Sequence, residues 1–254
     1  MIYVLSDIHG NLANFKSIMK QIKLKPDDTL YVLGDVIDRY PDGIKIIRKL
    51  MKMPNAKMLL GNHEYMMLEA IDDPFDSDNY DEQYEHLCRM RLWYDNQGRV
   101  THNYLKHIRK DVRSEIFRYL RGLPTNLEIE VNGRKYRLVH GAPKELYTDY
   151  QRFYDNETEC AVWHRWKDDD PDCDDCIGVF GHTPTQEFQK NNPLEIWTSY
   201  NKRRIGIDCG SGYPTAEMQH RKHPVIGRLA CLRLDDMKVF YSEVKTIEEE
   251  KKNE

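Results

Sequence analysis

Hydrophobic and polar positions alternate along the chain with two different periods, which predicts strands and helices in turn. Short apolar runs typical of buried strands occupy residues 1–6, 29–33 and 56–60. Between them, apolar residues recur at helical spacing over 11–22 and 43–53, and a further helix is expected from about Glu64. Strands that alternate with helices favour parallel pairing, with the helices packed on the sheet. The N-terminal part of the chain therefore predicts a βαβαβα arrangement.

The middle of the chain is predominantly helical. Residues 75–125 carry two helical patterns, which Gly122 and Pro124 end. The first pattern is marked by Tyr80, Tyr84, Leu87 and Tyr94, and the second by Leu105, Ile108, Val112, Ile116 and Tyr119. We expect this stretch to be a helical insertion or lid within one domain.

The remainder of the chain returns to strand patterns. Asn132-Gly133 between two apolar runs is a strong hairpin signal. Further strands are expected at 177–180, 204–208, 228–234 and 238–244. We predict a single domain over residues 1–244, followed by a charged C-terminal tail at 245–254.

Composition narrows the class of protein. Of 254 residues, 40% are hydrophobic and 31% are charged, with a formal net charge of -4; these values are ordinary for a globular protein and give no nucleic-acid footprint. No apolar stretch approaches the length of a membrane span, and no basic segment precedes the first apolar run. Six scattered cysteines are too sparse for a disulfide scaffold. We therefore expect a cytoplasmic protein that binds neither nucleic acid nor membranes.

Candidate chemistry lies where the predicted strands end. Five strands are followed by Asp, His or Asn, in the segments Asp7-x-His9, Gly34-Asp35-x-x-Asp38-Arg39, Gly61-Asn62-His63-Glu64, His140-Gly141 and Gly181-His182. In open α/β sheets, ligand sites form outside the carboxyl ends of strands. Carboxylate, imidazole and amide ligands suit Mn²⁺, Fe²⁺ or Zn²⁺, and a carboxylate such as Asp35 could bridge two ions. The pattern predicts a pair of divalent cations that activates a water for attack on phosphorus.

Each motif alone also has a plainer interpretation. A histidine at a strand end is often only a hydrogen-bonded polar residue, and Gly-Asn-His-Glu could be a turn before a helix. Five such motifs in this order make turn residues and helix caps a poor explanation of the whole set. Cys173 and Cys176 have metal-ligand spacing, but no second pair accompanies them. Their aspartate-rich segment, residues 168–175, is interpreted as a solvated acidic loop.

The five motifs together resemble the phosphoprotein phosphatase family of calcineurin-like metallophosphoesterases, in particular its short bacterial and lambda-type phage members. The family pattern DxH…GDxxDR…GNHE…H…GH is present in full between Asp7 and His182. The resemblance implies an α/β fold (α+β in some schemes), namely a four-layer αββα sandwich of two mixed sheets flanked by helices. It also implies hydrolysis of phosphomonoesters by a metal-bridging hydroxide, in a serine/threonine or dual-specificity protein phosphatase.

The resemblance implies a metal ligand at each matching position. The first ion would be held by Asp7, His9 and Asp35, and the second by Asp35, Asn62, His140 and His182. Mn²⁺ is the expected cation, with Fe²⁺, Zn²⁺ or Ni²⁺ as alternatives.

The same resemblance implies the catalytic and phosphate-binding residues. His63 would be the general acid that protonates the leaving oxygen, and Asp38 would orient it. Arg39 would bind the phosphoryl oxygens, together with Asn62. Arg165 stands where the phage-type enzymes carry a second arginine, although this match is looser.

The substrate stays open at this stage. Symmetrical diadenosine tetraphosphatases share the fold and the ligands, but they usually lack an aspartate at the position of Asp38 and have aspartate where this chain has Glu64. Both positions favour the protein-phosphatase branch. Tyr40 and Gln97 each stand where related enzymes have glycine, beside the expected substrate. The alternatives are a tetraphosphatase, a broad-specificity phosphodiesterase and a non-catalytic phosphate-binding module, so the expected partner is a phosphorylated protein or a small phosphoester.

Overall fold

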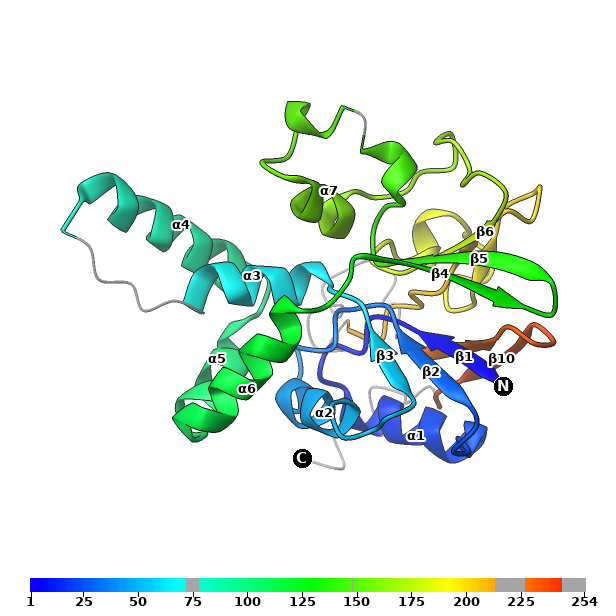
Figure 1. Ribbon diagram of the computed structural model, residues 1–254, viewed down its shortest axis with the longest axis horizontal. Coiled ribbons are helices and arrows are strands. Elements are labelled where there is room, and N and C mark those ends of the chain that lie inside the picture. The colour runs from blue at the N-terminus through cyan, green and yellow to red at the C-terminus, as the bar shows by residue number, and fades with distance from the viewer. Residues whose placement is uncertain (72–77, 148, 213–226, 244–254) are drawn as a thin grey trace.

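Two five-stranded sheets form the centre of the computed structural model, which describes residues 1–71, 78–147, 149–212 and 227–243. The strand order is β10-β9-β1-β2-β3 in the first sheet and β4-β5-β6-β8-β7 in the second. The two sheets lie face to face, and helices α1 and α2 cover the outer face of the first sheet (Figure 1). The expected sandwich of two mixed sheets flanked by helices is confirmed.

The first sheet begins with the predicted alternation of strands and helices. Its parallel strands are β1 (Ile2–Leu5), β2 (Thr29–Val32) and β3 (Ala56–Met58), connected by α1 (Leu12–Ile22) and α2 (Gly43–Leu50). The strands β9 (Ala230–Arg233) and β10 (Lys238–Tyr241) extend it in antiparallel fashion. Side chains alternate across β1, because Tyr3 and Leu5 pack among the helices while Val4 packs against the second sheet.

The second sheet is built around the predicted hairpin. Strands β4 (Asn126–Val131) and β5 (Arg134–Val139) are joined by Asn132 and Gly133, both with positive φ (51° and 74°), as a type I′ turn requires. The further strands are β6 (Ile177–Phe180) and β8 (Arg204–Gly206), both parallel to β5, and β7 (Trp197–Thr198) at the edge. The sequence did not predict β7, whose two residues are too few to show a period.

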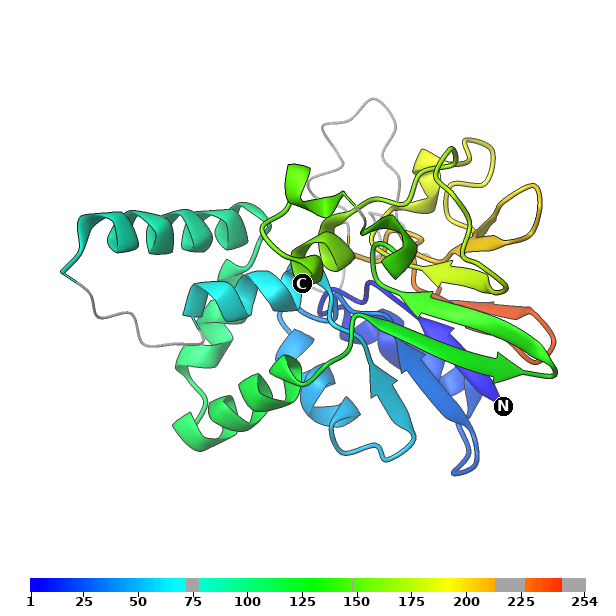
Figure 2. The ribbon, with the colours of Figure 1, turned by 45° about the horizontal axis from the view of Figure 1, so that its top comes forward.

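The helical middle contains three helices where two patterns were predicted. After α3 (Asn62–Ile71) come α4 (Tyr80–Asp95), α5 (Arg99–Lys106) and α6 (Lys110–Arg121). The second predicted pattern is divided between α5 and α6. These helices bury Leu105, Ile116 and Leu120 in the hydrophobic core that the helices form with the helix-facing side of the first sheet, called the first core below. Figure 2 shows α4 extending away from the sheets. The boundaries of the insertion and of the domain stay predictions, and residues 244–254 of the expected strand end and tail lie outside the described residues.

Helix α4 leaves much of its patterned face exposed. Its pattern residues Tyr80, Tyr84 and Leu87 are 77%, 61% and 64% exposed, and Trp93 is the buried residue of this helix. The N-terminal part of α4 is thus a helix at the predicted place, with its apolar residues open to solvent. A periodic pattern shows that one face is apolar, but not that another element covers it.

Short helices and a loop complete the layer beside the second sheet. These elements are α7 (Glu157–Trp163) and the 3₁₀ turns η1 (Lys144–Leu146), η2 (Tyr150–Arg152) and η3 (Thr185–Glu187). Most aspartates of the acidic loop lie at the surface, as expected, but Cys173 and Cys176 point inward and pack with Trp166 and Phe180. Among the described residues, no helix combines the length and apolar character needed to cross a membrane.

Candidate metal centre and active site

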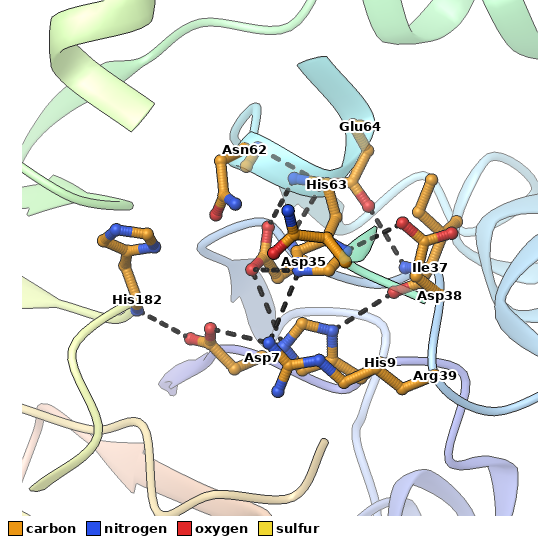
Figure 3. Close-up of polar contacts among 12 residues, drawn as sticks. Asp7, His9, Asp35, Ile37, Asp38, Arg39, Asn62, His63, Glu64 and His182 are labelled. Atoms are coloured by element: carbon orange, nitrogen blue, oxygen red, sulfur yellow. Dashed lines mark hydrogen bonds and ion pairs between the residues drawn. The ribbon is translucent and has the colours of Figure 1, made fainter. Parts of the chain in front are cut away.

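The predicted site residues meet at one edge of the sandwich, where the carboxyl ends of strands from both sheets face each other. Asp7 and His9 follow β1, Asp35 and Asp38 follow β2, and Asn62 and His63 open α3 (Figure 3). His140 follows β5 and His182 follows β6. All eight of these side chains are buried. Because buried polar groups need partners, their contacts define what the site can do.

The backbone at this edge is strained. Six of the predicted site residues have left-handed φ angles between 48° and 69°, namely Asp7, His9, Asp35, Asp38, Arg39 and His182. Each such conformation costs a non-glycine residue about 1–3 kcal/mol and tends to cluster at functional sites. Gly61 contributes in another way, since a Cβ there would collide with the backbone nitrogen and Oδ1 of Asp35. The loops are thus shaped to bring side chains together, at a cost in stability.

Asp35 lies between two groups of histidines. Its Oδ2 is 3.6 Å from Nε2 of His9, and its Oδ1 is 3.3 Å from Nε2 of His140. In the described part of the chain, two clusters have donor atoms close enough to share an ion, and both contain Asp35: His9, Asp35 and His63, and Asp35, His140 and His182. A carboxylate with one oxygen toward each cluster is placed as a bridging ligand would be.

The other predicted ligands lie at the same place. Oδ1 of Asn62 is 3.0 Å from Nε2 of His140. Oδ1 of Asp7 is 3.8 Å from Nε2 of His9, while its Oδ2 accepts a hydrogen bond from the backbone N–H of His182. The structure therefore brings all six predicted ligands together. The role of each as a ligand stays a prediction.

Backbone carbonyls orient three of the histidine rings. Nδ1 of His9 lies 3.2 Å from the carbonyl oxygen of Ile37. Nδ1 of His140 lies 2.7 Å from the carbonyl oxygen of Leu33, and Nε2 of His182 lies 3.0 Å from that of Trp163. A metal-bound histidine usually donates its other N–H in this way, which fixes the ring and its tautomer. Burial, reinforced by neighbouring positive groups, holds the pKa values of His9 and His182 well below the ordinary range. Both rings are thus neutral, the form that binds metals.

Buried carboxylates crowd the same edge. Burial raises the pKa of Asp7, and repulsion from Asp35 adds to the shift. Burial also raises the pKa of Asp208, with a further contribution from Asp7. For Asp35, burial alone would raise the pKa, but His140, His63 and His182 outweigh it and lower the value. Several buried carboxylates this close are unfavourable unless cations compensate them, so the donor set fits divalent metal ions.

His63 and Asp38 form the predicted pair. Nδ1 of His63 lies 2.7 Å from Oδ2 of Asp38, and the indole Nε1–H of Trp93 donates to the same oxygen at 2.9 Å. Nε2 of His63 points back into the site, 3.9 Å from Oδ2 of Asp35 and 3.5 Å from a guanidinium nitrogen of Arg39. Asp38 thus fixes the ring so that the remaining nitrogen faces Asp35 and Arg39. The carboxylate–imidazole arrangement can deliver a proton there.

Glu64 and Asp208 are two further buried acidic residues of the site, and sequence reasoning assigned neither of them a role there. The Glu64 carboxylate accepts hydrogen bonds from four backbone N–H groups, those of Asp35, Val36, Ile37 and Gly61, which holds the Asp35 loop in place. Burial, with repulsion from Asp35, raises the pKa of Glu64 to about 8. Asp208 follows β8 and could have been found by the strand-end rule, but the predicted strand ran through it.

Arg165 and Gln97, both expected near the substrate, are placed differently from the buried site residues. Arg165 is 44% exposed; its Nη1 donates to the backbone carbonyl of His182 at 3.0 Å and lies 3.6 Å from Glu187. It is therefore beside the second cluster, but directed in part at the backbone. Gln97 has a φ of 67°, which is a left-handed conformation that favours glycine. Glycine is the residue that the family resemblance led us to expect at this position.

Comparison with known proteins agrees with this fold. The two-sheet sandwich with a metal-compatible donor set at its strand ends is consistent with a metal-dependent phosphoesterase. The chain belongs to the calcineurin-like phosphoesterase family, whose model matches residues 1–208, and the predicted family resemblance is confirmed. Its fold is similar to that of a metallophosphoesterase from Sphaerobacter thermophilus, with a TM-score of 0.53 and 17% identity over 97% of this chain and 88% of that one.

Curated relatives fall into both of the expected branches. The chain is 35% identical over 68 residues to a symmetrical bis(5'-nucleosyl)-tetraphosphatase of Pectobacterium carotovorum, a match that covers 26% of this chain and 24% of the relative. It is 27% identical over 165 residues to serine/threonine-protein phosphatase 2 of Salmonella typhimurium, a match that covers 65% of this chain and 67% of the relative. The chain thus spans about a quarter of the length of the tetraphosphatase and two thirds of that of the phosphatase.

Proposed function

We propose that this chain hydrolyses phosphomonoesters with two divalent cations, and that its substrate is a protein phosphorylated on serine or threonine. The observation that carries the proposal is the position of Asp35, which has one carboxylate oxygen toward His9 and the other toward His140. Two ions on either side of this carboxylate would lower the pKa of a shared water and stabilise charge on the phosphoryl oxygens. Asp7, His9 and Asp35 would hold one ion, and Asp35, Asn62, His140 and His182 the other, with Mn²⁺ as the expected metal.

The chain's own residues would complete the reaction. Arg39 would bind the phosphoryl group, because its guanidinium lies beside His63 at the mouth of the site. His63 would donate a proton from Nε2 to the departing oxygen of serine or threonine. Asp38 would stabilise the charged ring through the 2.7 Å contact with Nδ1. Such a proton donor matters most for a poor leaving group such as an alkoxide.

The protein-phosphatase branch is favoured over the tetraphosphatase branch by two observations. Asp38, which tetraphosphatases usually lack, is fully buried and hydrogen-bonded to His63. The match to the Salmonella phosphatase also extends over much more of the chain than the match to the tetraphosphatase. We further propose a cytoplasmic location and a single domain over residues 1–244.

The test is a comparison of kcat/KM for Mn²⁺-loaded protein on a phosphothreonine peptide and on diadenosine tetraphosphate. The proposal expects a preference for the peptide, loss of turnover after removal of metal by a chelator, and recovery with Mn²⁺. A preference for the dinucleotide would move the chain to the tetraphosphatase branch. Phosphate binding without turnover of either compound would instead support a non-catalytic module.

A further inference from the structure

A groove opens between three helices next to the candidate active site. It has a volume of about 390 Å³ and lies among α3, α4 and α7. Three aromatic side chains line it, namely Tyr65, Tyr84 and Trp163. No part of the sequence pattern pointed to this groove, because its walls come from helices far apart along the chain. It also accounts for Tyr84, one of the α4 residues that the fold leaves 61% exposed.

Trp163 connects the groove to the metal centre. Its backbone carbonyl is 3.0 Å from Nε2 of His182, and its ring packs edge-on against the ring of His182, with 6.1 Å between centroids. The same indole lines the groove. A chain that carries a phosphoryl group into the metal centre would therefore have neighbouring residues within reach of the groove.

The groove is acidic. Among the described residues, its walls carry four carboxylates, Glu69, Glu85, Asp155 and Glu159, against one cationic side chain, Arg89. Arg89 is 43% exposed and lies 3.8 Å from Glu69 and 3.9 Å from Glu85, so it compensates those two only weakly. Glu159 accepts a hydrogen bond from the backbone N–H of Asp155, which fixes one carboxylate at the groove wall. The groove thus has a formal excess of negative charge beside aromatic faces.

This combination suits one kind of occupant. Arginine and lysine side chains bind carboxylates with their charged ends and pack against aromatic rings, through both cation–π contacts and their aliphatic stems. A polyphosphate chain carries several negative charges and would be repelled by the same walls. The charge of the groove therefore favours a basic peptide over a polyphosphate as its occupant.

We propose that the groove of α3, α4 and α7 binds basic residues that flank the phosphorylated residue of a protein substrate. This inference rests on the proposed function, since it specifies the substrate class of the same active site. The groove binds charged residues near the phosphoryl group, while the metal centre performs the reaction. Substrates with arginine or lysine close to the phosphorylated residue are hydrolysed faster than neutral or acidic ones.

The experiment uses three phosphothreonine peptides that differ only in whether the flanking positions are arginine, glutamine or glutamate. The expected ratio of kcat/KM for the arginine peptide over the glutamine peptide is about tenfold in low salt, and it falls as salt screens the charges. In the double variant Glu85→Gln, Glu159→Gln, which removes two of the four carboxylates, the ratio falls well below the wild-type value, toward one. The matched control, Glu115→Gln with Glu130→Gln, removes two exposed carboxylates outside the groove and keeps the wild-type ratio.

Two results would overturn the inference, and they can be told apart. The first result is that wild-type protein turns over the three peptides equally, or that the groove variant leaves the arginine-to-glutamine ratio of kcat/KM unchanged. It would exclude the groove as a binding site for basic residues while keeping the phosphatase assignment. Failure to hydrolyse any of the peptides, with turnover of diadenosine tetraphosphate, would overturn the proposed function and the inference with it.

Discussion

Polar side chains are buried in the strand-end loops, whereas apolar side chains are exposed on helix α4. The loops enclose carboxylates and imidazoles such as Asp35, His63 and His140 almost completely, and every one of these groups has a close polar partner. Helix α4 instead leaves Tyr80 and Leu87 largely open to solvent. The difference teaches that the two regions are built for different demands. Buried charged groups need fixed polar partners, whereas an exposed apolar face leaves surface on which another molecule can bind.

The largest effect is expected from a change at Asp35, the buried carboxylate at the centre of the strand-end loops. Asp35→Asn removes the carboxylate charge between the two histidine clusters, so turnover is expected to fall at least about a thousandfold and metal content to drop. Measured activity and metal analysis of the purified variant check this. The control is Asp27→Asn, an exposed position before β2 that should change neither.

The next largest effect separates proton donation from metal binding. His63→Asn should lower kcat on a phosphothreonine peptide by about 10²–10⁴-fold, while metal content stays near the wild-type value. The loss should be much smaller on an aryl phosphate, whose leaving group needs little protonation. Full activity on the peptide would show that His63 is not the acid.

A third change tests whether helix α6 of the helical segment contributes to the stability of the core. Leu120→Ala in α6 removes a fully buried side chain from the first core and should destabilise the protein by about 2–5 kcal/mol. Chemical denaturation measures the free energy of unfolding. A loss below 1 kcal/mol would mean that α6 contributes little to the core.

A smaller effect is expected where the helical segment supports the loops. Trp93→Phe keeps an aromatic ring but removes the N–H that donates to Asp38, at a cost of about 1–3 kcal/mol in stability. Because Asp38 orients His63, kcat on the peptide should fall up to about tenfold, with little change in KM. An unchanged kcat would limit Trp93 to a packing role.

The smallest effect is expected at the exposed face of α4. Leu87→Ser replaces a side chain that is 64% exposed, and the free energy of unfolding should change by less than about 0.5 kcal/mol. It is the counterpart of Leu120→Ala in the same helical segment. A loss of several kcal/mol would show that another surface covers Leu87 in solution.

The strand ends could be predicted from the sequence because a simple rule connects pattern and place. An apolar run followed by Asp or His marks the carboxyl end of a strand, and parallel strands bring such ends to one edge. The same rule would have included Asp208, had the strand been ended at Gly206. The contacts of Glu64 with four backbone N–H groups depend on loops from two strand ends and are not visible in the sequence.

The helices were harder to predict for a physical reason. The spacing of Tyr80, Tyr84 and Leu87 predicts a helix but does not show whether another element covers these residues, and in α4 all three are exposed. The division between α5 and α6 interrupts an apolar pattern that continues through Ile108 without a glycine or proline. The groove joins Tyr65, Tyr84 and Trp163 only after the chain has folded.

The most direct test of the central claim is the state of manganese bound to the wild-type protein. Metal analysis combined with electron paramagnetic resonance reports both the number of ions and whether they share a bridging ligand. The account predicts two Mn²⁺ per chain with an exchange-coupled spectrum that Asp35→Asn abolishes. A single Mn²⁺ with an uncoupled spectrum, in protein that is fully active, would contradict it.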